Sequence, residues 1–216
     1  MDPILCKPKE IENKSFEIIK EELDKRKIFL PEEEEAVITR VIHATADFDY
    51  AETLCFSSGA MEEAKELLRS GAKIVTDTNM ALSGINRQAL FDLGIEAFCF
   101  MAEEEVEREA LMRGVTRAAV SMEFAAKTIS GPVMFVVGNA PTALITLHGL
   151  WKKGAYSPAF VVAVPVGFVN VELSKELILD SSFPYVVARG RKGGSSVAVA
   201  IVNAILYQCV AGEKDS

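Results

Sequence analysis

The stretch VMFVVGNAPTALITL (residues 133–147) contains the unit that decides the fold. An apolar run over Val133–Gly138 leads at once into a turn with Asn139 and Pro141, and then into a helical stretch over Ala140–Lys152. An apolar run that does not alternate with polar residues is typical of a strand buried on both faces. Asparagine caps helices well, and proline suits the first helical turn. The stretch therefore predicts a central parallel strand that runs directly into a helix.

Four further apolar runs repeat this pattern along the chain. They predict strands at Lys73–Asp77, Ile95–Phe100, Phe160–Val164 and Tyr185–Ala188, with helices at Gly59–Ser70, Thr116–Ser130 and 195–210. Alternating strands and helices favour an α/β fold, a doubly wound, mostly parallel sheet with helices on both faces in a Rossmann-like three-layer arrangement. An N-terminal helical segment precedes it. No repeat, low-complexity tract or linker divides the sequence, so we expect a single domain over residues 1–216.

The composition limits the kinds of partner and compartment. The chain has 23 basic and 31 acidic side chains, a net charge of −8, which argues against a general nucleic-acid binder. An anionic ligand must therefore meet a local basic cluster. The N-terminus lacks the pattern of a signal peptide, and the longest apolar stretch, Ala159–Val169, is too short to span a membrane. The four cysteines form no C-x-x-C pair, which favours a reduced cytoplasmic protein over a zinc site.

In a doubly wound sheet, ligands bind beyond the carboxyl ends of the strands. The turns at that edge hold most of the Asn, Gly, Pro, Ser and Arg residues that a binding site would use. They are DTNMALSGINR (77–87), GNAPTAL (138–144), PVGFVNVELSKE (165–176) and RGRKGGSS (189–196). We therefore expect the functional site along this edge.

Two of these turns are candidates for binding an anion. Arg189, Arg191 and Lys192 precede two glycines and a helix start at Ser195, so cations and open N–H groups would meet there. The alternative is a surface loop with ordinary capping serines. The turn GNAPTAL offers Asn139 and Thr142 beside a helix start, and is equally well formed as a plain strand-to-helix turn. Neither turn has the spacing of a Walker A loop or of G-x-G-x-x-G.

His43 is the sharpest single candidate for acid–base chemistry. It shares a helix face with polar groups and could donate a proton near neutral pH, although a surface helix histidine would have the same spacing. Arg117 opposes the dipole at a helix start, so it either has another role or points into solvent. His148 lies in an apolar helix and is interpreted as structural. No Ser-His-Asp order and no metal-ligand spacing is present, which disfavours covalent or metal-assisted hydrolysis.

Taken together, the motifs resemble the precorrin-8X methylmutase (precorrin isomerase) family, including its cobalt-precorrin-8 members. The matching stretches run in the family's order from Ser15 to about Ala200: KSFEIIKEE, RVIHATADFDYAE, VTDTNMALSGI, GNAPTAL, PAFVVAVPVGFVNVELSKE and RGRKGGSSVAVA. The chain departs from the family pattern at Ala44 and Ala46, where Thr and Gly are expected, and at His148, where a residue other than histidine is usual.

The resemblance implies an isomerase of cobalamin biosynthesis. Its reaction is an intramolecular 1,5-sigmatropic methyl shift from ring-carbon 11 to ring-carbon 12 of a corrin-type macrocycle. That shift converts precorrin-8X to hydrogenobyrinic acid, or cobalt-precorrin-8 to cobyrinic acid, with no cofactor and no metal held by the protein. On the same resemblance His43 is the catalytic acid and family members form homodimers. On the predicted helix, Asp47 lies one turn on from His43 and could orient its imidazole.

The resemblance also assigns the groups that bind the substrate. Its acetate and propionate carboxylates would meet polar and basic side chains in the matching motifs: Ser15, Ser83, Thr116, Arg117, Asn139, Thr142, Arg189, Arg191, Lys192 and Ser195. Apolar walls for the flat macrocycle would come from Phe48, Met80 and Leu82. Two other functions remain open, a tetrapyrrole carrier without turnover and a nucleotide- or phosphate-binding domain.

Overall fold

A computed structural model describes residues 7–214 as one six-stranded sheet flanked by helices. The strand order is β1-β6-β5-β4-β2-β3. All neighbouring strands pair in parallel except β1, which is antiparallel to β6 at the edge. The strands are β1 (Leu54–Phe56), β2 (Lys73–Thr76), β3 (Ala97–Phe98), β4 (Val133–Val137), β5 (Phe160–Ala163) and β6 (Tyr185–Ala188).

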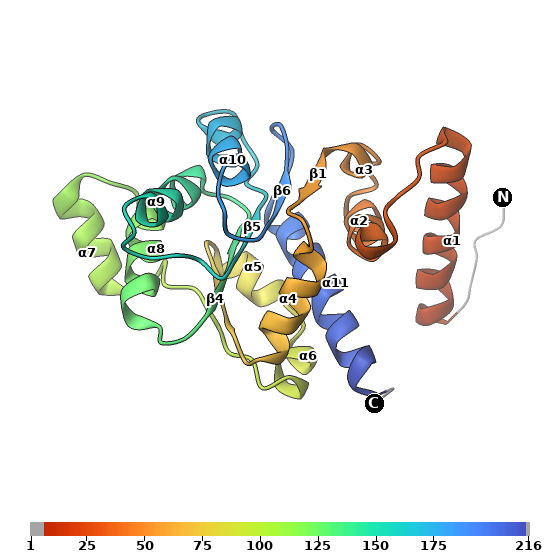
Figure 1. Cartoon of the computed structure of the whole chain (residues 1–216), viewed down its shortest axis with the longest axis horizontal. Coiled ribbons are helices and arrows are strands. Elements are labelled where there is room, and N and C mark those ends of the chain that lie inside the picture. The colour runs from red at the N-terminus through yellow and green to blue at the C-terminus, as the bar shows by residue number, and fades with distance from the viewer. Residues whose placement is uncertain (1–6, 215–216) are drawn as a thin grey trace.

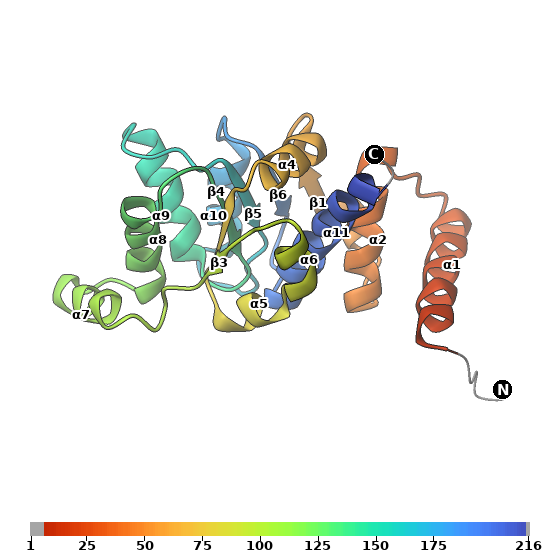
Figure 2. The ribbon, with the colours of Figure 1, turned by 90° about the horizontal axis from the view of Figure 1, so that it is seen from below.

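Helices cover both faces of this sheet (Figures 1 and 2). One face carries α4 and α11 together with α5 and α6, and the other carries α8, α9 and α10. The helices are α1 (Pro8–Arg26), α2 (Glu32–Thr45), α3 (Tyr50–Thr53), α4 (Ala60–Arg69), α5 (Asn79–Gly84), α6 (Arg87–Asp92), α7 (Glu104–Arg113), α8 (Arg117–Thr128), α9 (Pro141–Lys152), α10 (Val171–Leu179) and α11 (Ser195–Lys214). The expected doubly wound α/β architecture is confirmed.

The sheet separates two apolar cores, and β4 shows why its sequence is apolar throughout. Met134 and Val136 pack into the core beneath α11, whereas Val133, Phe135 and Val137 pack into the core beneath α8 and α9. Successive side chains of a strand point to opposite faces, so a central strand covered on both sides has no position for a polar residue.

The N-terminal helices extend this architecture to one side. Helix α2 packs its apolar residues, Val37, Ile38, Val41 and Ile42, into the core shared with α11, and α1 in turn packs on α2. Figure 1 shows α1 at one end of the molecule, with α2 between it and the sheet. Within residues 7–214, no helix combines the length and the apolar composition that a membrane crossing requires.

The structure also differs from the sequence expectations in detail. The edge strand β1 was not expected, since it has only three residues. Strand β3 covers Ala97–Phe98 rather than Ile95–Phe100, because it pairs with β2 at only two positions. Helices α5 and α10 begin inside stretches that were expected to be turns.

The topology places a switch point at the carboxyl ends of β2 and β4. From β2 the chain passes to β3 on one side, and then returns to β4 on the other side. Neighbouring loops diverge at such a point and leave a crevice in which ligands bind. Figure 2 shows α5, the start of α11 and the C-terminal end of α2 along this same lower edge of the molecule.

Candidate active site

Asp77 occupies the switch point and organises the turn after β4. Its side chain is fully buried. One carboxylate oxygen accepts the N–H of Gly138 at 2.9 Å, and the other accepts those of Asn139 and Ala140 at 2.8 and 2.7 Å. Burial raises the pKa of Asp77, and the three N–H donors oppose that rise. The main-chain donors of this turn are therefore already used by the protein.

The start of α11 sits directly on the same turn. The Thr78 and Ser195 hydroxyl oxygens lie 2.9 Å apart, and Thr78 also caps α5 by accepting the N–H of Ala81. A Cβ on Gly138 would come within 2.8 Å of the Ser195 main chain, so only glycine permits this approach. Ser195, a predicted binding residue, thus lies at the centre of the carboxyl edge.

The predicted residues Thr116 and Thr142 join the starts of α8 and α9. Their hydroxyl oxygens lie 2.7 Å apart, and Thr116 caps α8 by accepting the N–H of Ala119. Arg117 is exposed and lies 3.9 Å from Glu107 on α7. The Asn139 side chain is exposed and forms no hydrogen bond within residues 7–214.

Two predicted serines lie on helices α1 and α5. The Ser15 hydroxyl donates to the carbonyl oxygen of Ile11, one turn back on α1, at 2.9 Å. Ser83 is exposed on α5. The structure therefore brings together the residues from the turns after β2 and β4 and from the start of α11, whereas Ser15 belongs to the outermost helix.

His43 lies in the last turn of α2 and is exposed to solvent. The centroid of its imidazole ring is 5.1 Å from that of Phe16 on α1. The Arg40 guanidinium also lies against Phe16. It is 4.9 Å from the centroid of the Phe16 ring and 5.2 Å from that of the Tyr207 ring, and it forms an ion pair with Glu12 at 2.6 Å. The α1 helix therefore positions an aromatic ring beside the predicted acid.

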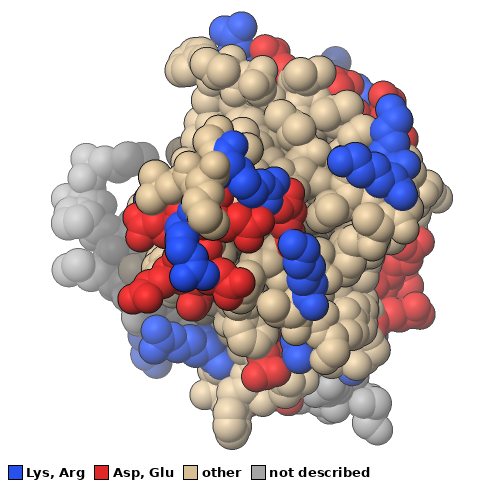
Figure 3. All heavy atoms as spheres, turned by 90° about the vertical axis from the view of Figure 1, so that its left-hand side faces the viewer, with Lys and Arg blue, Asp and Glu red and all other residues tan. Residues whose placement is uncertain are grey.

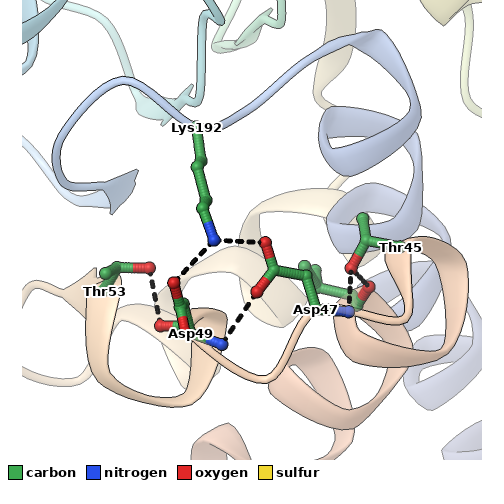
Figure 4. Close-up of polar contacts among 6 residues, drawn as sticks. Thr45, Asp47, Asp49, Thr53 and Lys192 are labelled. Carbon is green, nitrogen blue, oxygen red and sulfur yellow. Dashed lines mark hydrogen bonds and ion pairs between the residues drawn. The ribbon is translucent and has the colours of Figure 1, made fainter.

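The expectation that Asp47 orients His43 is wrong for this structure. Helix α2 ends at Thr45, and Ala46 adopts a left-handed conformation with φ of +54°, so residues 43 and 47 are not one helical turn apart. The described residues include no hydrogen bond between them. The Asp47 carboxylate instead contacts Lys192 at 2.6 Å and accepts the N–H of Asp49 (Figure 4).

Lys192 ties the loop before α11 to the end of α2. Its ammonium contacts both Asp47 and Asp49 at 2.6 Å (Figure 4). The hydrogen bond from Lys192 lowers the pKa of Asp47, and the two carboxylates raise the pKa of Lys192. Lys192 was predicted to bind substrate, but the structure shows its charge already paired with the segment that follows His43.

The two arginines of this loop also lie beside carboxylates. Arg191 is 3.1 Å from Glu172 and stacks over the Phe168 ring at 5.6 Å, and Arg189 is 4.0 Å from Glu176. Both arginine side chains are more than half exposed, at 61% and 57%. Exposed pairs of this kind exchange partners at little cost, so both arginines remain available to a carboxylate ligand.

Exposed apolar side chains accompany these polar groups. Met80 on α5 is 74% exposed, and Phe168 and Val169 on the loop after β5 are 83% and 79% exposed. Of the other expected wall residues, Leu82 is half-buried and Phe48 packs against the core beneath Arg26. A large flat ligand would thus find apolar surface along this edge.

Charge elsewhere on the surface is mixed. Figure 3 shows acidic and basic side chains interleaved over α7, where Arg113 pairs with Glu109 and Glu123. On that face the basic side chains form no continuous patch. Within the described residues no group of three or more His, Cys, Asp or Glu side chains is placed to hold a metal ion. Cys55 and Cys99 are free, and Cys6 lies outside the described residues.

Three side chains of the site were missed from the sequence. Asp77 and Thr78 follow β2 directly within a turn that was recognised, but nothing in the sequence indicates that a carboxylate turns back onto the main chain. Lys175 carried a clearer signal. It occupies the buried face of α10 with Val171, Ser174 and Ile178, a spacing normally filled by apolar residues.

Comparison with known proteins finds relatives over nearly the whole chain. The family described as precorrin-8X methylmutase matches residues 10–208. The cobalt-precorrin-8 methylmutase of Salmonella typhimurium is 45% identical over 205 residues, 93% of this chain and 95% of its own. The precorrin-8X methylmutase of Pseudomonas aeruginosa is 39% identical over 178 residues, 82% and 85% of the two chains. The crystal structure of precorrin-8x methyl mutase from Thermus thermophilus is similar with a TM-score of 0.82 at 35% identity, covering 94% of this chain and 98% of that one.

Proposed function

The chain belongs to the precorrin-8X methylmutase family, isomerases of cobalamin biosynthesis, and on that premise we propose that its carboxyl-edge site binds a corrinoid precursor and catalyses the methyl shift. The substrate is precorrin-8X or its cobalt-containing counterpart, as in the names of the relatives. The observation that carries the proposal is the position of His43. Its exposed ring lies at the end of α2, which Lys192 ties to the loop before α11.

His43 acts as the acid in the proposed mechanism. It donates a proton, or a strong hydrogen bond, to the pyrrolic nitrogen next to the migration site and so withdraws electron density from the conjugated ring. The methyl group then moves from ring-carbon 11 to ring-carbon 12 within the same molecule, and the proton returns to His43. Positioned acid catalysis of this kind typically contributes about a hundred- to ten-thousand-fold. The shift is redox-neutral and needs no external methyl donor, which supports a reaction without a cofactor.

The carboxylates of the substrate bind to groups along the carboxyl edge. Arg189 and Arg191 exchange their exposed glutamate partners for substrate carboxylates, since guanidinium groups suit bidentate contacts. Ser195, Thr142 and the free side chain of Asn139 supply further hydrogen bonds. Thr116, which is hydrogen-bonded to Thr142, and its neighbour Arg117 extend this set, as does Ser83 on α5, whereas Ser15 lies on α1. Met80 and Phe168 offer apolar surface to the macrocycle.

The same proposal includes a homodimer in the cytoplasm, with no nucleic-acid partner. The exposed apolar side chains at the carboxyl edge support the homodimer, because exposed apolar patches mark interaction sites. Light scattering of the purified protein tests the homodimer, and a mass equal to one chain at micromolar concentration would contradict it.

The turnover assay tests the enzyme proposal directly. Purified protein mixed with precorrin-8X, and separately with cobalt-precorrin-8, is expected to give the absorption change of the rearranged chromophore with no added cofactor. His43→Ala is expected to lose about a hundredfold or more in kcat while product binding stays within a fewfold. His148→Ala is the matched control, since this second histidine lies on α9 beside Trp151, and it should turn over normally.

Three other results would overturn the proposed mechanism or function. Full activity in His43→Ala would overturn the mechanism. Tight product binding without turnover in the unmodified protein would make the chain a tetrapyrrole carrier. A thermal shift with ATP or NAD and none with a corrinoid would favour a nucleotide-binding function instead.

A further inference from the structure

Lys175 is a buried cation directly behind the loop 189–194. It lies on α10 with no exposed surface. Its ammonium donates hydrogen bonds to the carbonyl oxygens of Gly190 at 2.7 Å and Lys192 at 2.8 Å. Both partners are main-chain oxygens, and within residues 7–214 Lys175 forms no ion pair. Taking a charged side chain out of water is costly, so a buried ammonium with neutral partners needs a compensating role.

The contacts of the loop leave four of its N–H groups, those of residues 190–193, without a hydrogen bond within residues 7–214. The carbonyl oxygens of Gly190 and Lys192 accept from Lys175, and that of Arg191 accepts the N–H of Gly167 at 3.2 Å. No hydrogen bond within the described residues uses the N–H groups of Gly190, Arg191, Lys192 or Gly193. Successive free N–H groups of a glycine-rich loop form a concave seat for an anion.

The loop is held tightly against the end of β5. The N–H of Gly194 donates to the Val164 carbonyl oxygen at 2.8 Å, and a Cβ on Gly193 would come within 2.1 Å of that same oxygen. Gly193 has a φ of +156° and Gly194 one of +132°. Glycines therefore hold this loop against the end of β5, and Lys175 contacts the loop from α10.

Lys175 also differs from the cations that line the surface. Arg189, Arg191 and Lys192 each lie within 4.0 Å of a carboxylate of the protein. The field of those cations is partly cancelled before any ligand arrives. The charge of Lys175 has no such partner, and burial limits its screening by solvent.

We propose that Lys175 is a positioning residue for the substrate, holding the carbonyl groups of loop 189–194 inward so that the loop N–H groups receive a carboxylate of the corrinoid. Its positive charge, which forms no ion pair within residues 7–214, adds to the attraction for that carboxylate. This inference rests on the proposed function and adds to it a residue that carries no direct substrate contact. Burial lowers the pKa of Lys175 to about 8, and nearby Glu172 opposes that shift, so most of the side chain is charged at neutral pH.

The test compares a carboxylate ligand with an uncharged one of the same shape. Lys175→Met keeps the length of the side chain and removes its charge and its donors. Dissociation constants are measured for hydrogenobyrinic acid and for its fully methyl-esterified form. The variant is expected to bind the acid about tenfold or more weakly and the ester within about twofold of the unmodified protein, the range for a lost charge-assisted interaction. In turnover, KM should rise by a similar factor while kcat changes less than threefold.

A matched control removes a lysine elsewhere. Lys65→Met deletes a charge from α4, where Lys65 pairs with Glu62 at 2.7 Å, and should leave both dissociation constants unchanged. If Lys175→Met fails to fold, Lys175→Gln serves instead, because its amide still donates to one carbonyl oxygen. The same selective loss of acid binding is expected from that variant.

The outcomes separate the two levels of the proposal. If the unmodified protein neither binds nor converts a corrinoid, the proposed function fails. If it does both and the variant binds the acid equally well, the role of Lys175 is wrong. Equal weakening for acid and ester would also overturn it, since a lysine that only supports the fold would affect both ligands alike.

Discussion

Two turns at the same edge of the sheet are organised by buried charges of opposite sign. The turn after β4 surrounds Asp77, whose carboxylate takes the N–H groups of residues 138–140. The loop after β6 surrounds Lys175, whose ammonium takes the carbonyl oxygens of Gly190 and Lys192. The first turn thereby uses these N–H donors within the protein, whereas in the second loop the N–H groups of residues 190–193 form no hydrogen bond within residues 7–214.

The difference shows how a buried charge decides what the main chain offers to a ligand. A carboxylate behind a turn acts as an internal anion and leaves no N–H group for a second one. An ammonium behind a turn satisfies the acceptors and leaves the donors. A protein with a net charge of −8 can bind a polyanion if it places a buried ammonium behind a binding loop, where solvent does not screen its charge.

The largest expected effect comes from replacing the Asp77 carboxylate, which only accepts hydrogen bonds, by an amide that also donates them. Asp77→Asn keeps the volume and one accepting oxygen, but it sets the amide NH₂ against at least one of the three main-chain N–H groups that the carboxylate accepts. We expect a loss of about 3–5 kcal/mol in the free energy of unfolding, as for a broken buried charge network. Urea unfolding measures it. Asp180→Asn, at an exposed position, is the control and should change stability by less than about 0.5 kcal/mol.

The buried lysine makes a prediction about the pH dependence of stability. Its pKa is about 8 in the folded chain against an ordinary value of 10.5, so between these values the unfolded chain binds more protons. The contribution of Lys175 to stability therefore rises with pH over this range, by about 2–3 kcal/mol in total. The difference in unfolding free energy between the unmodified protein and Lys175→Met, measured at pH 7.5 and pH 10, should show that rise. A difference that is flat with pH would place the pKa of Lys175 near its ordinary value.

The surface pairing of the same loop should matter less. Lys192→Met removes the contacts to Asp47 and Asp49, which are partly exposed, so we expect a smaller loss of stability at pH 7 than for either buried group. Lys192 lowers the pKa of Asp47, so this stabilisation is present above the ordinary value of 3.8 and is lost as pH falls through the lowered value. Unfolding of the two proteins should converge in strong acid. A difference that persists there would indicate a packing role for the Lys192 side chain.

The layers of this fold were predictable because central strands covered on both faces admit few polar residues. β4, β5 and β6 were all found close to their true bounds. The three-residue β1 was not, since an edge strand this short leaves no pattern, and its pairing with β6 joins residues 130 to 134 positions apart. Helix α5 was hidden by its Asn and Ser residues and by Thr78 before it, which also suit turns.

The sequence predicted which turns meet at the carboxyl edge, but it did not predict the hydrogen bonds and ion pairs among their side chains. The turns that meet at the carboxyl edge were identified from the strand ends alone. Which charge pairs with which depends on geometry that the sequence does not encode locally: Lys192 reaches Asp47 across 145 positions, and Asp77 reaches Gly138 across 61. The expected Asp47–His43 contact failed because one residue, Ala46, ends the helix between them.

The smallest expected effect concerns that residue. Ala46 has a φ of +54°, a conformation that costs alanine about 1 kcal/mol and glycine almost nothing. Ala46→Gly removes this cost but frees the unfolded chain, so thermal unfolding should show a net gain of at most about 0.5 kcal/mol. The same substitution at Ala44, inside α2, should lose about 1 kcal/mol.

The opposite signs of these two substitutions make the test specific to the end of the helix that carries His43. If the helix ends at Thr45, as in the structure, kcat should be unchanged in Ala46→Gly because the main chain keeps its path to Asp47 and Lys192. If Ala46→Gly instead loses as much stability as Ala44→Gly, the helix continues past residue 45. Asp47 would then lie one turn from His43 rather than beside Lys192, and the link between loop 189–194 and the end of α2 would be broken.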